Sequence, residues 1–215
     1  MKKEPQRQED RAISLLQKRG MMRLSEFLEE GITAATISRM EQRAAVNQLS
    51  RGLYQLPDAL LDANHSLAVA AKLIPNGVIC YGSALAFHEL TDHVPPYVWM
   101  AIGPRDWRPK ISRPRIEIVR FGPKEFDKGI ERHIIEGVSV PIYVPAKSIV
   151  DLFKSGQRPR AFHKAPAGLA QATQAMKDAL RQRKATPSEI AKYAVEAGIW
   201  KKVVQPRLET LTIDA

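Results

Sequence analysis

The strongest constraint on the fold is a succession of three short amphipathic segments near the N-terminus. Apolar side chains in residues 8–19, 23–30 and 33–46 recur every three or four positions, which is the spacing of one face of an α-helix. We expect Ser25 to be the N-cap of the second helix and Thr33 to be the N-cap of the third. Two short helices joined by a glycine-containing turn are typical of a helix-turn-helix.

A β-hairpin is expected directly after the third helix. Two segments with strand character, 46–49 and 53–56, flank a three-residue turn in which Gly52 occupies the position that needs a left-handed backbone. A hairpin in this place corresponds to the wing of a winged helix-turn-helix, with Arg51 at its tip. The sequence therefore predicts a winged helix-turn-helix domain over residues 1–58.

Residues 59–215 are expected to form a second domain of mixed structure. Segments with strand character alternate with turns in residues 74–146, and residues 147–215 have helical periodicity. Thr186 and Glu189 have the spacing of a helix capping box in this second stretch. We predict an α+β fold: an N-terminal winged helix-turn-helix, a small domain with a four- or five-stranded mixed or antiparallel sheet, and a helical C-terminal tail.

The charge of the chain favours a polyanionic partner. The 215 residues carry a net charge of +10, and residues 154–215 contribute twelve basic against five acidic side chains. Cys80 is the single cysteine and lies in an apolar stretch, which predicts a buried thiol in a reducing compartment. The sequence has no segment apolar enough for a signal peptide or a membrane span, so we expect a cytoplasmic protein with no membrane partner.

The polar face of the third expected helix carries the candidate DNA contacts. Hydroxyl, amide and guanidinium groups reach phosphates and base edges when such a helix enters the major groove. The candidates are Thr33, Thr36, Ser38, Arg39, Gln42 and Arg43, together with Arg51 on the wing. Because residues 1–58 have a net charge of only +2, use of the same fold as a protein-interaction module stays an alternative.

Two further basic regions are candidate nucleic-acid contacts. The first is the loop 104–115, where Trp107 is interleaved with Arg105, Arg108, Lys110, Arg113 and Arg115. The second is the helical tail, where Lys177, Arg181 and Lys184 are spaced so that they share much of one helical face. A solvated loop between two strands is an equal alternative for the first region. For the second we hypothesise that the tail adds to DNA affinity.

No catalytic, metal or cofactor site is expected. Gly82-Ser83 before an expected helix is similar to the start of nucleotidyltransferase sites, which hold Mg²⁺ with closely spaced carboxylates on the following strand. The following strand of this chain, residues 97–103, has no acidic residue, and the five histidines lack metal-ligand spacing. We therefore expect a protein that is not an enzyme. A degenerate nucleotidyltransferase-like protein that binds nucleotides or RNA is the alternative.

The middle of the chain resembles a known family. The segments that carry the resemblance are 82–92 (GSALAFHELTD), 95–96 (PP), 101–105 (AIGPR), 137–140 (GVSV) and 145–152 (PAKSIVDL). Together they resemble AbiEi-type antitoxins of type IV toxin–antitoxin, or abortive-infection, operons. The resemblance covers most of the chain, although its motifs are loose patterns of small and apolar residues.

The resemblance implies a bipartite protein. The N-terminal winged helix would bind repeats in its own promoter and repress the operon, with the recognition helix on residues 33–43 and the wing on residues 47–54. The domain at 59–215 would counter a nucleotidyltransferase-like toxin, often without a stable complex. The resemblance transfers no catalytic residues, and the concentration of positive charge in the tail departs from what a DNA-binding N-terminus leads one to expect.

Overall fold

The computed structural model describes residues 4–93, 95–156 and 168–213. It confirms the predicted α+β class, with a mixed sheet and a helical C-terminal tail. The chain divides into two compact units, each assembled from separate stretches of sequence. The first unit comprises residues 1–76, 109–116 and 132–140, and the second comprises residues 77–108, 117–131 and 141–215.

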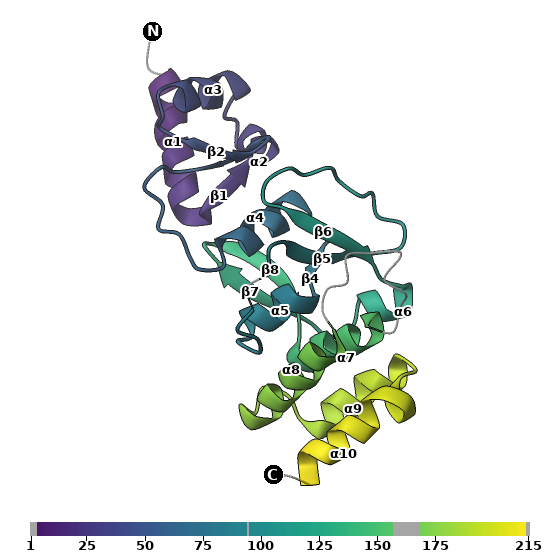
Figure 1. Cartoon of the computed structure of the whole chain (residues 1–215). Coiled ribbons are helices and arrows are strands. Elements are labelled where there is room, and N and C mark those ends of the chain that lie inside the picture. Colours follow the sequence, from purple (N-terminus) through teal and green to yellow (C-terminus); the bar gives the residue numbers. More distant parts are fainter. Residues whose placement is uncertain (1–3, 94, 157–167, 214–215) are drawn as a thin grey trace. The chain divides into compact units, whose positions relative to one another are not determined.

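The first unit is built around a small antiparallel sheet (Figure 1). Its elements are, in chain order, α1 (Glu4–Arg19), β1 (Met21–Arg23), α2 (Leu24–Glu29), α3 (Ala34–Gln42), β2 (Asn47–Ser50), β3 (Leu53–Gln55) and α4 (His65–Leu73). β3 is the central strand, because it pairs with β1 on one side and with β2 on the other. The three helices and the hairpin are confirmed as elements. β1 was not predicted, because a three-residue strand is too short to show an alternating pattern.

The apolar faces that predicted the helices form the core of this unit. Leu16 of α1, Phe27 of α2 and Ile37 of α3 are fully buried in one cluster. Tyr54 of the central strand meets Phe27 edge-on, with 6.3 Å between the ring centroids. Such aromatic pairs add roughly 0.5–1.5 kcal/mol to the burial of their surfaces. The spacing of apolar residues along the sequence thus determines which face of each helix turns inward.

The second helix begins earlier than predicted. Ser25 was expected to be its N-cap, but α2 begins at Leu24 and Arg23 is the N-cap. The backbone N–H of Arg23 donates to Oε2 of Glu26, at 2.6 Å. A carboxylate three residues after the cap satisfies a terminal N–H as in a capping box, and it displaces the hydroxyl of Ser25 from that role.

The second unit contains most of a five-stranded mixed sheet and the helical tail. The elements after residue 76 are β4 (Val78–Ile79), α5 (Tyr81–Phe87), β5 (Val98–Ile102), β6 (Ile116–Arg120), α6 (Pro123–Phe126), β7 (Ile130–Ile135), β8 (Val138–Tyr143), α7 (Pro145–Ser155), α8 (Leu169–Arg181), α9 (Pro187–Glu196), the π-helical turn η1 (Trp200–Val204) and α10 (Gln205–Ile213). The strand order is β6-β5-β4-β8-β7. β4 pairs antiparallel with β5 and parallel with β8, which confirms the mixed sheet. β7 was not predicted, and residues 132–135 and 138–140 of its hairpin with β8 belong to the first unit.

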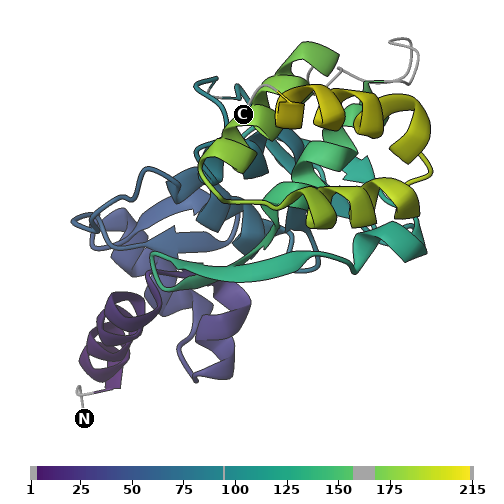
Figure 2. The ribbon, with the colours of Figure 1, turned by 90° about the horizontal axis from the view of Figure 1, so that it is seen from below.

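The helices after residue 145 pack on one another in the second unit. α7 contacts α5, α8 and α9, and α10 contacts η1 and α8 (Figure 2, green to yellow). Nine-tenths or more of each residue from Ala146 to Phe153 is buried, which makes α7 the centre of this layer. The predicted capping box of α9 is confirmed, since Thr186 Oγ1 accepts from the Glu189 N–H and the Glu189 carboxylate accepts from the Thr186 N–H. No helix among the described residues has the length and apolar character needed to cross a membrane.

A buried carboxylate joins distant parts of the first unit. The side chain of Glu136, in the turn between β7 and β8, is only 6% exposed. It accepts hydrogen bonds from the Asp62 N–H at 2.7 Å and from Gln55 Nε2 at 3.1 Å, and it lies 2.8 Å from His65 Nδ1. A buried charge is tolerated when several donors satisfy it. Glu136 therefore fixes the hairpin turn against the central strand β3 and the start of α4.

Gly20 allows this turn to approach the end of α1. Gly20 has a φ of +71°, and a Cβ at this position would lie 1.7 Å from the backbone oxygen of Glu136. Gly52, in the β2–β3 turn, has a nearly equal φ of +70°, but a Cβ there would meet nothing closer than Leu24 Cβ at 4.0 Å. The two glycines therefore have the same backbone conformation and differ in the space around them.

Gly20→Ala is expected to cost roughly 3 kcal/mol or more in unfolding free energy, because backbone overlap adds to the left-handed penalty of about 1–2 kcal/mol. Gly52→Ala is the matched control and should cost only about that penalty. Urea unfolding of both variants measures the difference. Equal losses would contradict the close approach of the Glu136 turn to Gly20.

Candidate nucleic-acid interface

Helix α3 presents a polar surface opposite its buried side. Ile37 and Met40 face the core, whereas Ser38, Arg39, Gln42 and Arg43 are exposed. Thr33 is the N-cap as predicted, and its hydroxyl accepts from the Thr36 N–H at 3.3 Å. The exposed groups are hydrogen-bond donors and cations of the kinds that contact phosphates and base edges.

The predicted outward orientation of Thr36 is wrong. Thr36 is 1% exposed, and its hydroxyl lies 2.8 Å from Gln8 Oε1 and 3.0 Å from the Thr33 hydroxyl. Helical spacing placed it at the edge of the polar face, where packing against α1 decides whether a side chain is covered. Gln8 supplies the acceptor that satisfies the buried threonine hydroxyl in this position.

Thr36 supports a neighbouring arginine instead. Arg39 Nη2 donates to Thr36 Oγ1 at 3.3 Å, so the guanidinium is anchored from one side while the residue stays exposed. Arg43 lies 3.6 Å from Glu9 Oε2 in an ion pair whose arginine side chain is 66% exposed. Exposed pairs of this kind contribute roughly 0–1 kcal/mol, so a phosphate can displace the glutamate at little cost.

The hairpin after α3 has the predicted turn. Arg51 is exposed at the turn, and the left-handed conformation of Gly52 confirms the prediction made for that position. The register between β2 and β3 shifts between Gln48 and Ser50, so the hairpin is irregular close to its tip. The amide of Gln48 donates to the Tyr54 hydroxyl at 3.1 Å, which ties β2 to the central strand.

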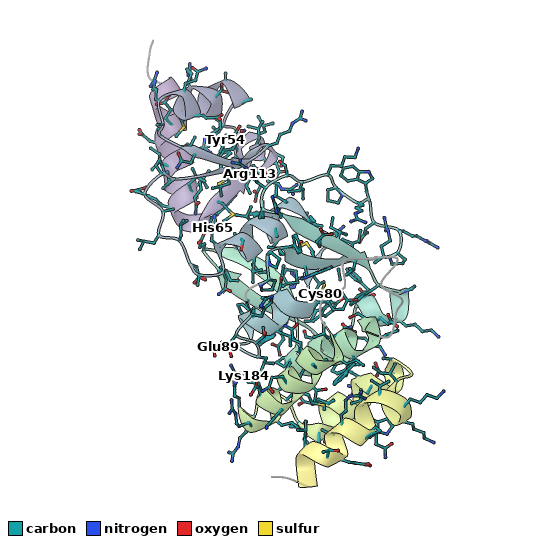
Figure 3. All side chains as sticks on the ribbon, in the orientation of Figure 1. Tyr54, His65, Cys80, Glu89, Arg113 and Lys184 are labelled. Atoms are coloured by element: carbon teal, nitrogen blue, oxygen red, sulfur yellow. The ribbon has the colours of Figure 1, made fainter. Side chains whose placement is uncertain are left out.

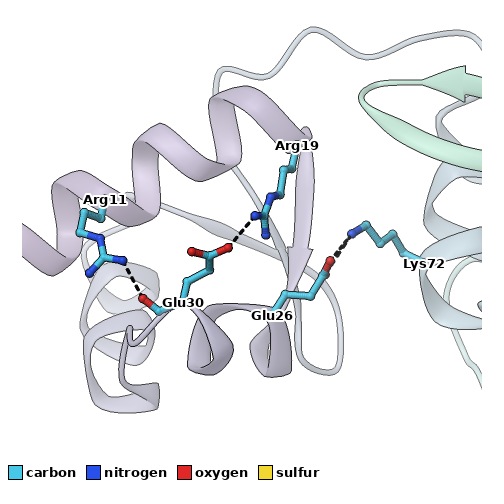
Figure 4. A network of polar contacts seen from close by, with 5 residues as sticks. All are labelled: Arg11, Arg19, Glu26, Glu30 and Lys72. Atoms are coloured by element: carbon cyan, nitrogen blue, oxygen red, sulfur yellow. Dashed lines mark hydrogen bonds and ion pairs between the residues drawn. The ribbon is translucent and has the colours of Figure 1, made fainter.

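Ion pairs fix the helices that support α3 (Figure 4). Glu30, just after α2, accepts from Arg19 Nη2 at 2.6 Å with its carboxylate and from Arg11 Nη2 at 2.8 Å with its backbone oxygen. Lys72 of α4 lies 2.7 Å from Glu26 Oε1. Burial opposes ionisation of Glu26, but the Arg23 N–H and the Lys72 ammonium outweigh it and lower the pKa of this carboxyl.

The basic loop between β5 and β6 is exposed but divided between the two units. Its five cations, Arg105, Arg108, Lys110, Arg113 and Arg115, are all exposed. Arg105 and Arg108 belong to the second unit, together with Trp107, which is 77% exposed. Lys110, Arg113 and Arg115 belong to the first unit, which also contains α3 and the β2–β3 hairpin. The loop therefore supplies cations to the unit that carries the predicted DNA contacts.

The basic side chains of the tail differ in their exposure and in the partners they have within the protein. Lys177 and Arg181 are exposed, and Arg181 pairs with Asp178 at 2.9 Å. Lys184 instead donates to the His88 carbonyl oxygen at 2.7 Å and pairs with Glu89 at 2.9 Å (Figure 3). Lys184 thus links α8 to the end of α5 within the second unit.

The Gly82-Ser83 pair has a structural role in the second unit. Both residues are buried, and Ser83 Oγ donates to the Tyr97 carbonyl oxygen at 3.2 Å and accepts from the Trp99 N–H at 2.9 Å. Gly82 lies against Pro95, which a Cβ would meet at 3.4 Å. The hydroxyl therefore ties α5 to the start of β5. Among the described residues, no group of three or more His, Cys, Asp or Glu side chains could hold a metal ion.

A buried ion pair in α7 was not found from the sequence. Lys147 Nζ lies 2.7 Å from Asp151 Oδ2, with the two side chains 4% and 9% exposed, and 4.3 Å from the centroid of the Tyr143 ring. Burial raises the pKa of Asp151 to about 6, although Lys147 partly opposes the shift. The i, i+4 spacing of Lys147 and Asp151 was the available signal, but such pairs usually lie on exposed helix faces.

Cys80 is fully buried as predicted, and burial raises the pKa of its thiol.

Lys147→Met is expected to destabilise the protein by about 3–5 kcal/mol, because it leaves the Asp151 carboxylate buried without its partner. The double variant Lys147→Met/Asp151→Leu removes both charges, so it should recover most or all of that loss. Thermal and urea unfolding at pH 7 compare the two variants with the wild type. A double variant as unstable as the single one would show that the loss comes from packing around Lys147 and not from an unpaired charge.

Comparisons with known proteins give a likeness of fold. No family model matches the sequence, and no curated protein matches it. Among solved structures, the chain is similar to the RV2827C protein from Mycobacterium tuberculosis, with a TM-score of 0.59 and 13% sequence identity. The match covers 96% of this chain and 80% of that one. At this identity the likeness extends to the fold alone.

Proposed function

We propose that the chain is a cytoplasmic, non-enzymatic DNA-binding protein that represses its own operon and acts as an antitoxin. In this proposal the first unit is a winged helix-turn-helix, α3 enters the major groove, and the hairpin at Arg51 is the wing. The second unit counters a nucleotidyltransferase-like toxin, as the resemblance to AbiEi-type antitoxins implies.

The observation that carries the DNA-binding half is the exposed polar face of α3. Four side chains that can donate hydrogen bonds to DNA are exposed: Ser38, Arg39 and Gln42 of the helix and Arg43 at its C-cap. The other side of the helix is anchored by Ile37 and Met40. Such an arrangement leaves the helix surface free for a groove while the core fixes its orientation. Arginine suits this position because its planar guanidinium can bind guanine with two hydrogen bonds.

The order of elements in the first unit supports the same proposal. A helix, a short strand, two helices and a two-stranded hairpin follow one another along the chain, and the first strand pairs with the hairpin. The ion pairs of Glu30 and Glu26 hold the supporting helices in place. A groove-binding helix benefits from such a rigid base, because base contacts lose energy when their donors are poorly positioned.

Arg39→Ala is expected to weaken binding to the upstream DNA of the operon by about 1–3 kcal/mol, if Arg39 contacts a base edge. The double variant Arg39→Ala/Arg43→Ala should lose the preference for that DNA over a scrambled duplex of equal length. Fluorescence anisotropy titrations with both duplexes measure the ratio of the two affinities. Lys192→Ala removes one exposed charge from α9 and serves as the control, which should keep the preference.

Equal affinity of the wild type for the upstream and the scrambled duplex would overturn the repressor proposal. If Arg39→Ala instead weakened binding to both duplexes by the same factor, Arg39 would contact the DNA backbone and not a base. Specificity would then have to come from Ser38, Gln42 or Arg43.

The antitoxin half is tested separately. We expect the chain, expressed from an unrelated promoter, to restore growth of cells that produce the nucleotidyltransferase-like toxin encoded beside it. Arg39→Ala/Arg43→Ala should restore growth equally well, because the proposed toxin-countering surface lies in the second unit. Growth arrest that persists with the wild-type chain present at full level would contradict the antitoxin role.

A further inference from the structure

The first unit contains a basic hollow beside the wing. The hollow has a volume of about 460 Å³, and it is lined by residues from the β1–α2 junction, the β2–β3 turn and the loop before β6. Its polar lining consists of the cations Arg23, Arg51 and Lys110 and the hydroxyls of Ser25, Ser50 and Ser112. We call this feature the wing–loop hollow. All of its lining residues belong to the first compact unit.

The wing–loop hollow is positively charged without compensation. None of its lining residues is acidic, and no described carboxylate forms an ion pair with Arg23, Arg51 or Lys110. The nearby carboxylate of Glu26 is bound to the Arg23 N–H and to Lys72. Three cations placed together repel one another, and an anion between them removes that repulsion.

One side-chain nitrogen of a residue that lines the hollow lacks a protein partner. Arg23 Nε is buried and has no hydrogen-bond partner among the described residues. Buried donors are nearly always satisfied, and an orphaned one indicates a missing acceptor such as a bound ion or ligand atom. The cationic and hydroxyl groups that line the hollow suit an anionic acceptor with several oxygen atoms.

We infer that the wing–loop hollow binds a backbone phosphate of duplex DNA, next to the groove contacted by α3. Guanidinium, ammonium and hydroxyl donors are the groups that usually contact phosphate oxygens. A volume of this size, open to solvent, accommodates a phosphate together with the sugars on either side. The inference rests on the proposed function, because Arg51 is both the wing residue and part of the lining.

The inferred contact does not read sequence. Phosphates are the same on every duplex, so the hollow contributes equally to binding of the operator and of random DNA. It adds to the small net charge of residues 1–58, because Lys110 lies outside that range in the sequence but belongs to the same unit and lines the same hollow. The salt dependence of binding is therefore the property that this contact changes.

The test compares Lys110→Ala with the wild type on the upstream and scrambled duplexes between 50 and 200 mM salt. Log affinity falls as log salt rises, and loss of one phosphate contact makes this negative slope shallower by about 0.9 on both duplexes. Over this range the wild type should therefore lose about 3-fold more affinity than Lys110→Ala. Arg132→Ala removes an exposed charge from β7 in the same unit, outside the hollow, and should keep the wild-type slope.

A Lys110→Ala slope equal to that of Arg132→Ala would overturn the inference, even if the upstream duplex is preferred and the repressor proposal stands. A reduced slope on both duplexes without any preference between them would support the phosphate site and overturn operator recognition. Arg23→Gln should reproduce the loss seen with Lys110→Ala. Tighter binding of single-stranded RNA than of either duplex, lost in Lys110→Ala, would overturn the assignment to DNA.

Discussion

The first unit depends on the carboxylate of Glu136. Three donors from two segments converge on this one side chain, Gln55 of β3 and the pair Asp62 and His65 at the start of α4, and they place the β7–β8 turn against both. The close approach of the same turn to Gly20 fixes the end of α1. A domain containing only the N-terminal helices and hairpin would lack these contacts. The base that orients α3 is therefore made of residues from more than one stretch of the chain.

The ability of each basic side chain to bind an anion depends on whether that side chain already has a partner within the protein. The tail has the largest excess of positive charge in the sequence, but Lys184 is bound to the end of α5 and Arg207 donates to the Val203 carbonyl oxygen. Arg158, Arg160 and Lys164, which belong to the same excess, lie outside the described residues. Residues 1–58 have a net charge of only +2, yet Arg23 and Arg51 line one hollow together with Lys110 and without acidic partners. Net charge alone is thus a poor guide to where a polyanion binds.

The candidate site was predicted in part. The exposed positions of α3 followed from helical periodicity, because Ile37 and Met40 mark the buried side and the polar residues that flank them face outward. Thr36 was misassigned because it lies at the border of the two faces, where the packing of α1 and the acceptor of Gln8 decide its burial. Arg23 was missed because a single arginine at the start of a helix has no pattern. Its importance comes from Lys110, 87 positions along the sequence.

The sequence by itself determined the three N-terminal helices, the following hairpin with its glycine turn, the capping box of α9 and the buried state of Cys80. These features depend on interactions between residues close in the chain or on simple burial of apolar groups. Only the tertiary structure decided the strands β1 and β7, the division into two discontinuous units, the buried pair of Lys147 and Asp151, and the wing–loop hollow. Each of these arises where distant segments meet, and local periodicity carries no information about which distant segments pack together.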